Sequence, residues 1–293
     1  MPLPRTLCSA VLVWIVAAAG LRAQSPADST ARPDSLRRSL SIPRLALIGG
    51  ITAGGFVYGH ILQNDLWWKG ERSDFHFDWD HDWTYALGAD KLGHFYFPYL
   101  TTNIYRQAFT WAGMDTSSAL WAAGGLAFTY QTYIEVRDGF SAAWGFSWGD
   151  FAANTLGALY PVAQYHLPPL RNFDVRISFY PSEKFRNGAY GAIIDDYEST
   201  FHWLTVNVHD LLPENLRGDY PAWLNIAVGH SVRGLDLKGA GGHELFLSLD
   251  WNLEGLPGDG WFWKLLKENL KFYHLPAPAV KIYPGVVWYG VHF

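Results

Sequence analysis

The chain has 293 residues, of which 49% are hydrophobic, and this is ample for the core of one large domain or two ordinary ones. Its formal net charge of −5 argues against a nucleic-acid partner, because binding to phosphates needs a basic surface. The 15 Trp, 16 Tyr and 18 Phe residues are more than a typical cytosolic domain uses. Such a content suits either an aromatic core or a membrane, lipid or carbohydrate surface.

The first 23 residues have the plan of a secretory signal peptide, which predicts export to the cell envelope. Arg5 precedes an apolar run that begins at Leu7, and cleavage is expected after Ala23. The only cysteine, Cys8, lies at the start of this run, where no lipoprotein cleavage box is possible. A mature chain would therefore have no disulfide, no thiolate metal site and no cysteine nucleophile. Residues 24–43 are polar and lack apolar periodicity, which predicts a flexible linker.

Residues 44–62 form an apolar, glycine-rich run that is predicted to be helical and is near the length needed to cross a bilayer. A membrane helix and a buried bundle helix both fit this pattern.

The connector that follows carries Asp78, Asp80 and Asp82 at alternate positions, as at the start of a calcium loop. Such a loop would need Gly at position 83 and Glu at position 89, where this chain has Trp83 and Ala89. We therefore predict an interfacial loop with solvated acidic side chains instead.

Three further helices are predicted from the apolar periodicity and the capping residues. Pro98 should kink or split the first of them, because proline lacks the N–H that an internal helical turn needs. With the earlier run they give a four-helix domain over residues 44–168. The three segments run from Asp90 to about Trp111, from Ser117 to about Val136 and from Trp148 to about Gln164.

Beyond the helices, hydrophobic side chains alternate with a period of two, which predicts a small antiparallel β region over 169–293 with one amphipathic helix at 261–273. The last residues resemble the closing strand of an outer-membrane barrel. About five strands are predicted, too few for a closed membrane barrel of about eight or more. The fold class is therefore α+β. The predicted strands are 173–180, 203–208, 222–232, 244–253 and 287–293.

Each of the last three helices carries a small polar cluster on an otherwise apolar background. Residues three or four apart share a helix face, so the polar side chains of each cluster project one way, and we expect the three faces to converge. Lys91 would offset part of the negative charge, and a pair with Glu135 is one arrangement that this allows. The candidate site residues are Asp90, Lys91, His94, Glu135, Asp138, Asp150 and Asn154.

Three roles for these residues stay open. They could form a structural polar network of caps and ion pairs. They could bind the headgroup of an envelope lipid or a glycan, with Lys91, His94 and Asn154 in contact with it. They could form a hydrolase site in which His94 and a carboxylate hold a hard cation or act as general acid and base. The chain has no H-E-x-x-H or G-x-S-x-G motif, so neither a reaction nor a cofactor is predicted.

The ordered motifs D-K-x-x-H from Asp90, E-x-x-D-G-F from Glu135 and F-S-x-x-D-x-x-A-N-x-x-G from Phe146 resemble the YfiM-like family of predicted periplasmic lipoproteins, a domain of unknown function. The resemblance covers roughly residues 60–165 and extends more distantly to VanZ-like membrane proteins. It implies a four-helix envelope protein of the periplasm or outer membrane. Its partner would be a membrane lipid, a cell-wall component or an outer-membrane protein, and the resemblance implies no established reaction.

Overall fold

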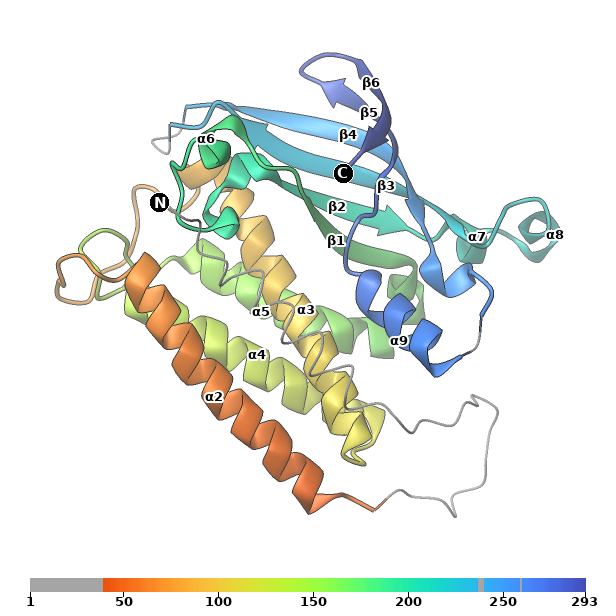
Figure 1. Cartoon of the computed structure of the whole chain (residues 1–293), viewed down its shortest axis with the longest axis horizontal. Coiled ribbons are helices and arrows are strands. Elements are labelled where there is room, and N and C mark those ends of the chain that lie inside the picture. The colour runs from red at the N-terminus through yellow and green to blue at the C-terminus, as the bar shows by residue number, and fades with distance from the viewer. Residues whose placement is uncertain (1–38, 237–239, 259) are drawn as a thin grey trace.

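The computed structural model describes residues 39–236, 240–258 and 260–293 (Figure 1). The predicted signal peptide, Cys8 and most of the predicted linker lie outside these residues. The described chain combines long helices with one six-stranded antiparallel sheet, which confirms the α+β class. It contains four short helices in addition to the four long ones, so the helical part is not limited to a four-helix bundle.

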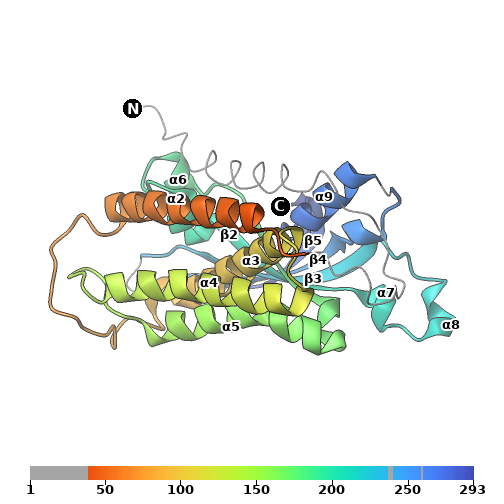
Figure 2. The same cartoon turned by 90° about the horizontal axis from the view of Figure 1, so that it is seen from below.

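Of the four long helices, α3, α4 and α5 pack against one another, and α2 lies beside them (Figures 1 and 2). Helix α3 runs continuously through Pro98, so of the two predicted effects, a kink or a split, the split is wrong. The side chain of Asp115 caps α4 and that of Ser147 caps α5. The bounds are α2 (Ile42–Leu66), α3 (Ala89–Trp111), α4 (Thr116–Asp138) and α5 (Trp148–His166).

A glycine sets the distance between α3 and α5. A Cβ atom added at Gly157 would lie 2.0 Å from the backbone oxygen of Phe95, so only glycine allows this approach. Gly157 is one turn beyond Asn154, and Phe95 follows His94. The contact therefore fixes how the polar residues of α3 face those of α5.

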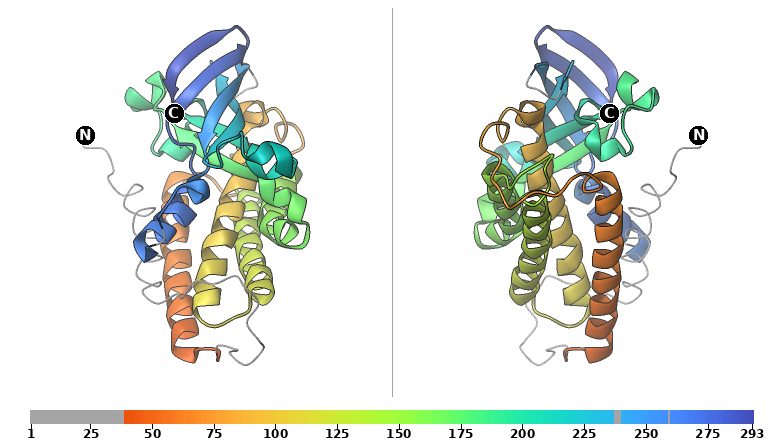
Figure 3. Two further views of the ribbon diagram at one scale, coloured as in Figure 1. Left: turned by 90° about the vertical axis from the view of Figure 1, so that its right-hand side faces the viewer. Right: turned by 90° about the vertical axis from the view of Figure 1, so that its left-hand side faces the viewer.

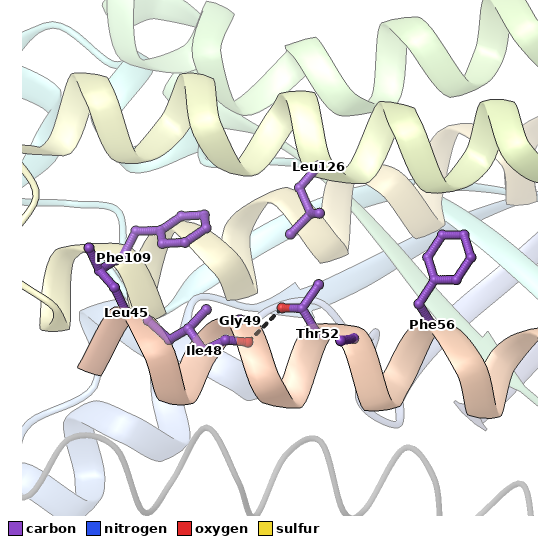
Figure 4. A pocket seen from close by; sticks show the side chains of 8 residues that line it. Leu45, Ile48, Gly49, Thr52, Phe56, Phe109 and Leu126 are labelled. Carbon is purple, nitrogen blue, oxygen red and sulfur yellow. Dashed lines mark hydrogen bonds between the residues drawn. The ribbon is translucent and has the colours of Figure 1, made fainter. Parts of the chain in front are cut away.

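Helix α2 is largely exposed. Among the described helices it is the one long and apolar enough to cross a membrane, and 6% of its most apolar stretch is buried. Only Ile48 and Gln63 are buried, which contradicts the alternative of a buried bundle helix. An open apolar pocket is lined by α2 together with Phe109 of α3 and Leu126 of α4 (Figure 4). Its lining contains no titratable side chain, so it offers no acid–base chemistry.

The sheet follows chain order from β1 to β6, and each neighbouring pair of strands is antiparallel. Figure 3 shows it extending away from the ends of the long helices. The strands are β1 (Phe173–Phe179), β2 (Thr200–Val206), β3 (Leu224–Arg233), β4 (Gly242–Trp251), β5 (Ala277–Tyr283) and β6 (Val287–His292). The short helices are α6 (Glu183–Arg186), α7 (Val208–Leu211), α8 (Glu214–Arg217) and α9 (Trp261–Leu270).

The sheet meets the helices mainly through β1. Tyr96 and Tyr99 of α3 pack with Ile177 of β1 and with Phe272, and all four side chains are 1% exposed. The hydroxyl of Tyr96 donates a hydrogen bond to the Phe272 carbonyl. Ile177 also forms a parallel bridge with Tyr273, so the segment before β5 returns to the first strand. This junction joins residues that are far apart in sequence.

Candidate functional site

The N-terminus of α3 follows an unusual turn. Ala86, Leu87 and Gly88 have φ angles of 46°, 56° and 72°, and this left-handed conformation is uncommon for residues other than glycine. Ala86 is fully buried, so its packing holds the turn in place. The turn directs the chain into α3 with Asp90 and Lys91 in the first turn of the helix.

The ammonium group of Lys91 lies at the centre of the cluster. Its Nζ is 2.9 Å from Asp82 Oδ1, 3.0 Å from Asp90 Oδ2 and 2.9 Å from Asp150 Oδ1. Burial acts to lower the pKa of Lys91, but the Asp150 and Asp90 carboxylates outweigh it and raise that pKa above its ordinary value. Lys91 therefore stays charged and joins a loop, α3 and α5. The possible pairing of Glu135 with Lys91 is not among these contacts.

Asp82 is a member of this cluster that the sequence interpretation missed. Its side chain accepts hydrogen bonds from Ser147 Oγ at 2.5 Å and from the Gly149 amide at 3.0 Å. Burial acts to raise the pKa of Asp82, but the hydrogen bonds from Ser147 and Lys91 outweigh it and lower the pKa. Asp82 is 7% exposed, so the prediction that the acids of this loop are all solvated is wrong for this residue.

The second half of the cluster centres on His94. Its Nδ1 lies 3.2 Å from Asn154 Oδ1 and 3.3 Å from Glu135 Oε1, and its Nε2 lies 3.7 Å from Asp150 Oδ1. The Asn154 amide donates a hydrogen bond to Glu135 Oε1 at 2.9 Å. The His94 side chain is 26% exposed while that of Glu135 is 1% exposed. The histidine therefore connects solvent to a buried carboxyl group.

Three carboxyl groups in the cluster hold their protons more tightly than usual. Burial, reinforced by the charges of Asp150 and Asp138, raises the pKa of Glu135 well above its ordinary value. Burial raises the pKa of Asp90 to about 6, with the Asp150 charge adding to it. Burial raises the pKa of Asp138 to about 7, although a 2.6 Å hydrogen bond from Trp68 opposes the rise.

The structure thus brings the seven predicted residues into one region. Asp90, Lys91 and Asp150 share the lysine contacts, and His94, Glu135 and Asn154 form the histidine contacts. Asp138 lies at the edge, where its bond from Trp68 ties α4 to the loop after α2. Asp82, Ser147 and Trp68 complete the cluster. Ser147 has a sequence signal in its cap pattern, whereas Asp82 and Trp68 join through tertiary contacts that no local spacing reveals.

Among the described residues, one group of side chains could hold a metal ion. His94, Glu135 and Asp150 each offer one ligand atom, and these three atoms lie within 4.8 Å of one another. Ligand atoms about 2.1 Å from a shared ion are roughly 3–4 Å apart, so modest side-chain movements would bring them together. An imidazole nitrogen with two carboxylate oxygens suits a divalent cation such as manganese, iron or zinc.

Protonation of the cluster predicts how stability changes with pH. An unfolded Asp loses its proton near its ordinary pKa of 3.8, whereas folded Asp90 and Asp138 keep theirs to about pH 6 and 7. Since the unfolded state ionises first, these groups should make the folded protein less stable as pH rises from about 4 to about 7, with no further change above that range. Denaturation by urea in the presence of a chelator, at pH 5 and at pH 8, measures this. His202 and His230, whose pKa values burial lowers to about 3 and about 4, change stability in the opposite direction over this range, so the profile is compared with that of an Asp138→Asn variant. An equal pH dependence of the two proteins would contradict the prediction.

The chain was compared with known protein families, and part of it matches a family model. Residues 78–166 match the model of a family described as predicted periplasmic lipoprotein (DUF2279). This range spans the loop with Asp82 and helices α3 to α5, and so contains all seven predicted site residues. No curated protein and no solved structure matches the chain. The protein thus belongs in the cell envelope, as predicted, and the matched family has no assigned function.

Proposed function

We propose that this envelope protein binds a divalent cation through His94, Glu135 and Asp150, and through that cation an anionic membrane lipid or cell-wall component. The convergence of the three ligand atoms within 4.8 Å carries the proposal. The narrower likeness to YfiM-like and VanZ-like proteins agrees with such a role in envelope processes. The site lies within the part of the chain that matches the periplasmic family.

The charge of the cluster favours a cation as the first ligand. Five carboxyl groups (Asp82, Asp90, Glu135, Asp138 and Asp150) face two basic groups, Lys91 and Arg137, and 2 − 5 gives a formal charge of −3 with His94 neutral. Buried carboxylates are costly unless they pair, share protons or bind a cation. An anionic ligand alone would add to the repulsion.

Lys91 is poorly placed to bind a headgroup directly, although the sequence suggested that role. It is 8% exposed and already contacts three carboxylates. Oδ1 of Asp90, by contrast, is buried and has no hydrogen-bond partner. Lys91 therefore does not satisfy every carboxylate oxygen of the cluster, and a bound cation would add the positive charge that the formal −3 calls for.

Exposed aromatic rings surround the same end of the helices. Trp83 is 69% exposed, and its ring lies 5.9 Å from Lys91 Nζ. Trp148 is 48% exposed and stacks on Phe77 with ring centroids 5.8 Å apart. Rings of this kind bind the apolar part of a lipid or the face of a sugar. They fit a ligand whose anionic group reaches the cation near His94.

Calorimetric titration with Mn²⁺ and with Zn²⁺ tests the cation site. We expect one ion per chain, and His94→Ala should weaken binding by at least about 100-fold, since even partners that only orient metal ligands are worth about 10–100-fold. His166→Ala is the matched control, because His166 is an exposed histidine at the end of α5. Equal affinities in the two variants, or no binding to the unmodified protein, would reduce the cluster to a structural polar network.

A metal-dependent hydrolase is the second candidate. It is favoured by the partly exposed ring of His94 lying 3.3 Å from Glu135 Oε1, because such a pair can move a proton to or from a substrate. Hydrolysis of a phosphate ester that required both the added cation and Glu135 would distinguish an enzyme from a binding protein.

A further inference from the structure

The two faces of the sheet differ sharply in polarity. On one face, Leu204, Val228 and Leu247 lie in register on β2, β3 and β4, with Ile226 and Leu249 in the next row. These five side chains are 38–46% exposed. Helix α3 covers the sheet at β1 and leaves them open. No Asp, Glu, Lys or Arg occupies this face on β2, β3 or β4.

The opposite face is buried, and it holds the charged side chains of these strands beside the packed aromatic rings of Phe201, Trp203 and Phe246. Arg176 Nη1 lies 3.0 Å from Asp250 Oδ1, and Thr205 donates a hydrogen bond to the same carboxylate. The His274 ring stacks on Trp203 with centroids 4.0 Å apart. Glu244 forms ion pairs with Arg233 and Lys281, and all three residues lie on the same face of the sheet as Asp250.

The exposed face departs from the usual arrangement, whereas the buried face keeps apolar rings in the core, as an ordinary sheet does. Antiparallel sheets in water place apolar side chains toward the core and polar ones toward solvent. Strands that border lipid do the opposite, with apolar side chains outward and polar ones inward. The apolar face of β2 to β4 therefore has the pattern expected of a surface in contact with hydrocarbon.

The length of this face and the residues at its two ends also fit contact with a lipid bilayer. From Leu224 to His230 the outward row spans about 20 Å at roughly 3.3 Å per residue, close to the apolar band of about 25 Å on membrane strands. At one end the exposed ring of Trp223 stacks on Trp251 with centroids 5.9 Å apart. Tryptophan is enriched where membrane meets water. At the other end, His230 and His243 share a hydrogen bond.

We propose that the apolar face of β2 to β4 lies against the hydrocarbon of an envelope membrane. The envelope location makes a bilayer available, and the exposed apolar helix α2 is a second surface of the same character.

Labelling with a polarity-sensitive fluorophore tests the contact. In a Cys8→Ser chain, Leu247→Cys carries the label on the apolar face, and Glu214→Cys on exposed α8 is the control. With vesicles of phosphatidylethanolamine and phosphatidylglycerol, emission from position 247 should shift to the blue and be quenched by nitroxide-labelled acyl chains, while position 214 should not respond. A blue shift that occurs without vesicles and grows with protein concentration would show that the face binds a second copy of the chain and not lipid. The absence of any shift would show that the face is in contact with water. Either result overturns the proposal.

A charge on the same face gives an independent measurement. Val228→Lys should weaken partitioning into these vesicles by about 100-fold, the equivalent of the roughly 2–4 kcal/mol that a lipid-facing lysine costs. Asn215→Lys on exposed α8 is the matched control and should partition normally. Equal partitioning of both variants would contradict lipid contact. Binding of Mn²⁺ should be the same in both, so failure here is separate from failure of the cation site.

Discussion

Replacement of Lys91 by methionine is expected to destabilise the protein by about 3–5 kcal/mol. The change keeps a long apolar stem but removes the only ammonium group within 3.0 Å of Asp82, Asp90 and Asp150 in the described structure. Three buried carboxylates would then lose their shared partner, and a buried charge without a partner costs several kcal/mol. Urea denaturation at pH 8 measures the loss.

The same variant should recover part of its stability in acid. Without Lys91 the three carboxyl groups would take up protons more readily in the folded state, so the deficit should be smaller at pH 5 than at pH 8. Lys69→Met is the matched control, because Lys69 pairs with Asp65 in an exposed position and such pairs contribute only about 0–1 kcal/mol. If both variants lost equal stability, the Lys91 contacts would contribute no more than a surface ion pair.

Among substitutions that add a single methyl group, Gly157→Ala is expected to lower the stability of the protein most. Its Cβ would lie 2.0 Å from Phe95 O and 2.8 Å from Phe95 C, both of them backbone atoms that cannot rotate away. Overpacking of this kind costs about 1–3 kcal/mol, and a clash with backbone on a neighbouring helix belongs at or above the upper end of that range. Thermal and urea denaturation measure it.

The clash at Gly157 should also separate His94 from Asn154, because the two helices must move apart. We therefore expect Gly157→Ala to lose the Mn²⁺ affinity as well as the stability. Gly125→Ala is the matched control, because a Cβ at that helical position meets nothing within 4 Å and alanine favours a helix over glycine by about 1 kcal/mol. A Gly157→Ala protein as stable as Gly125→Ala would show that α3 and α5 are not in close contact.

The sequence predicted those parts of the site that depend on helical periodicity. Asp90 and His94 lie four apart, as do Asp150 and Asn154, so their shared faces follow from helix geometry alone. The place of Asp82 in the cluster could not be predicted from helix geometry, because Asp82 lies in a loop whose path depends on its hydrogen bonds with Ser147 and Gly149. Which acid pairs with the lysine is likewise a matter of helix packing and not of spacing.

The same limit applies to the fold. The four long helices and five of the strands could be predicted because their apolar periods are regular. Strand β5 was missed because Pro278 lies inside it, and proline weakens a strand assignment by removing a backbone donor. The polarity of the sheet could not be read from alternation, since a period of two shows that the faces differ but not which of them meets water.

The junction of Tyr96, Tyr99 and Ile177 with Phe272 has a consequence for how the exported chain matures. An exported polypeptide emerges from the translocation channel with its amino end first, so α3 is outside long before residue 272 follows. Until then the part of these two aromatic rings that Phe272 covers stays open, on a helix that also carries the acidic cluster. This junction is therefore completed late. A nascent chain halted before residue 272 would expose an incompletely packed surface to periplasmic chaperones and proteases.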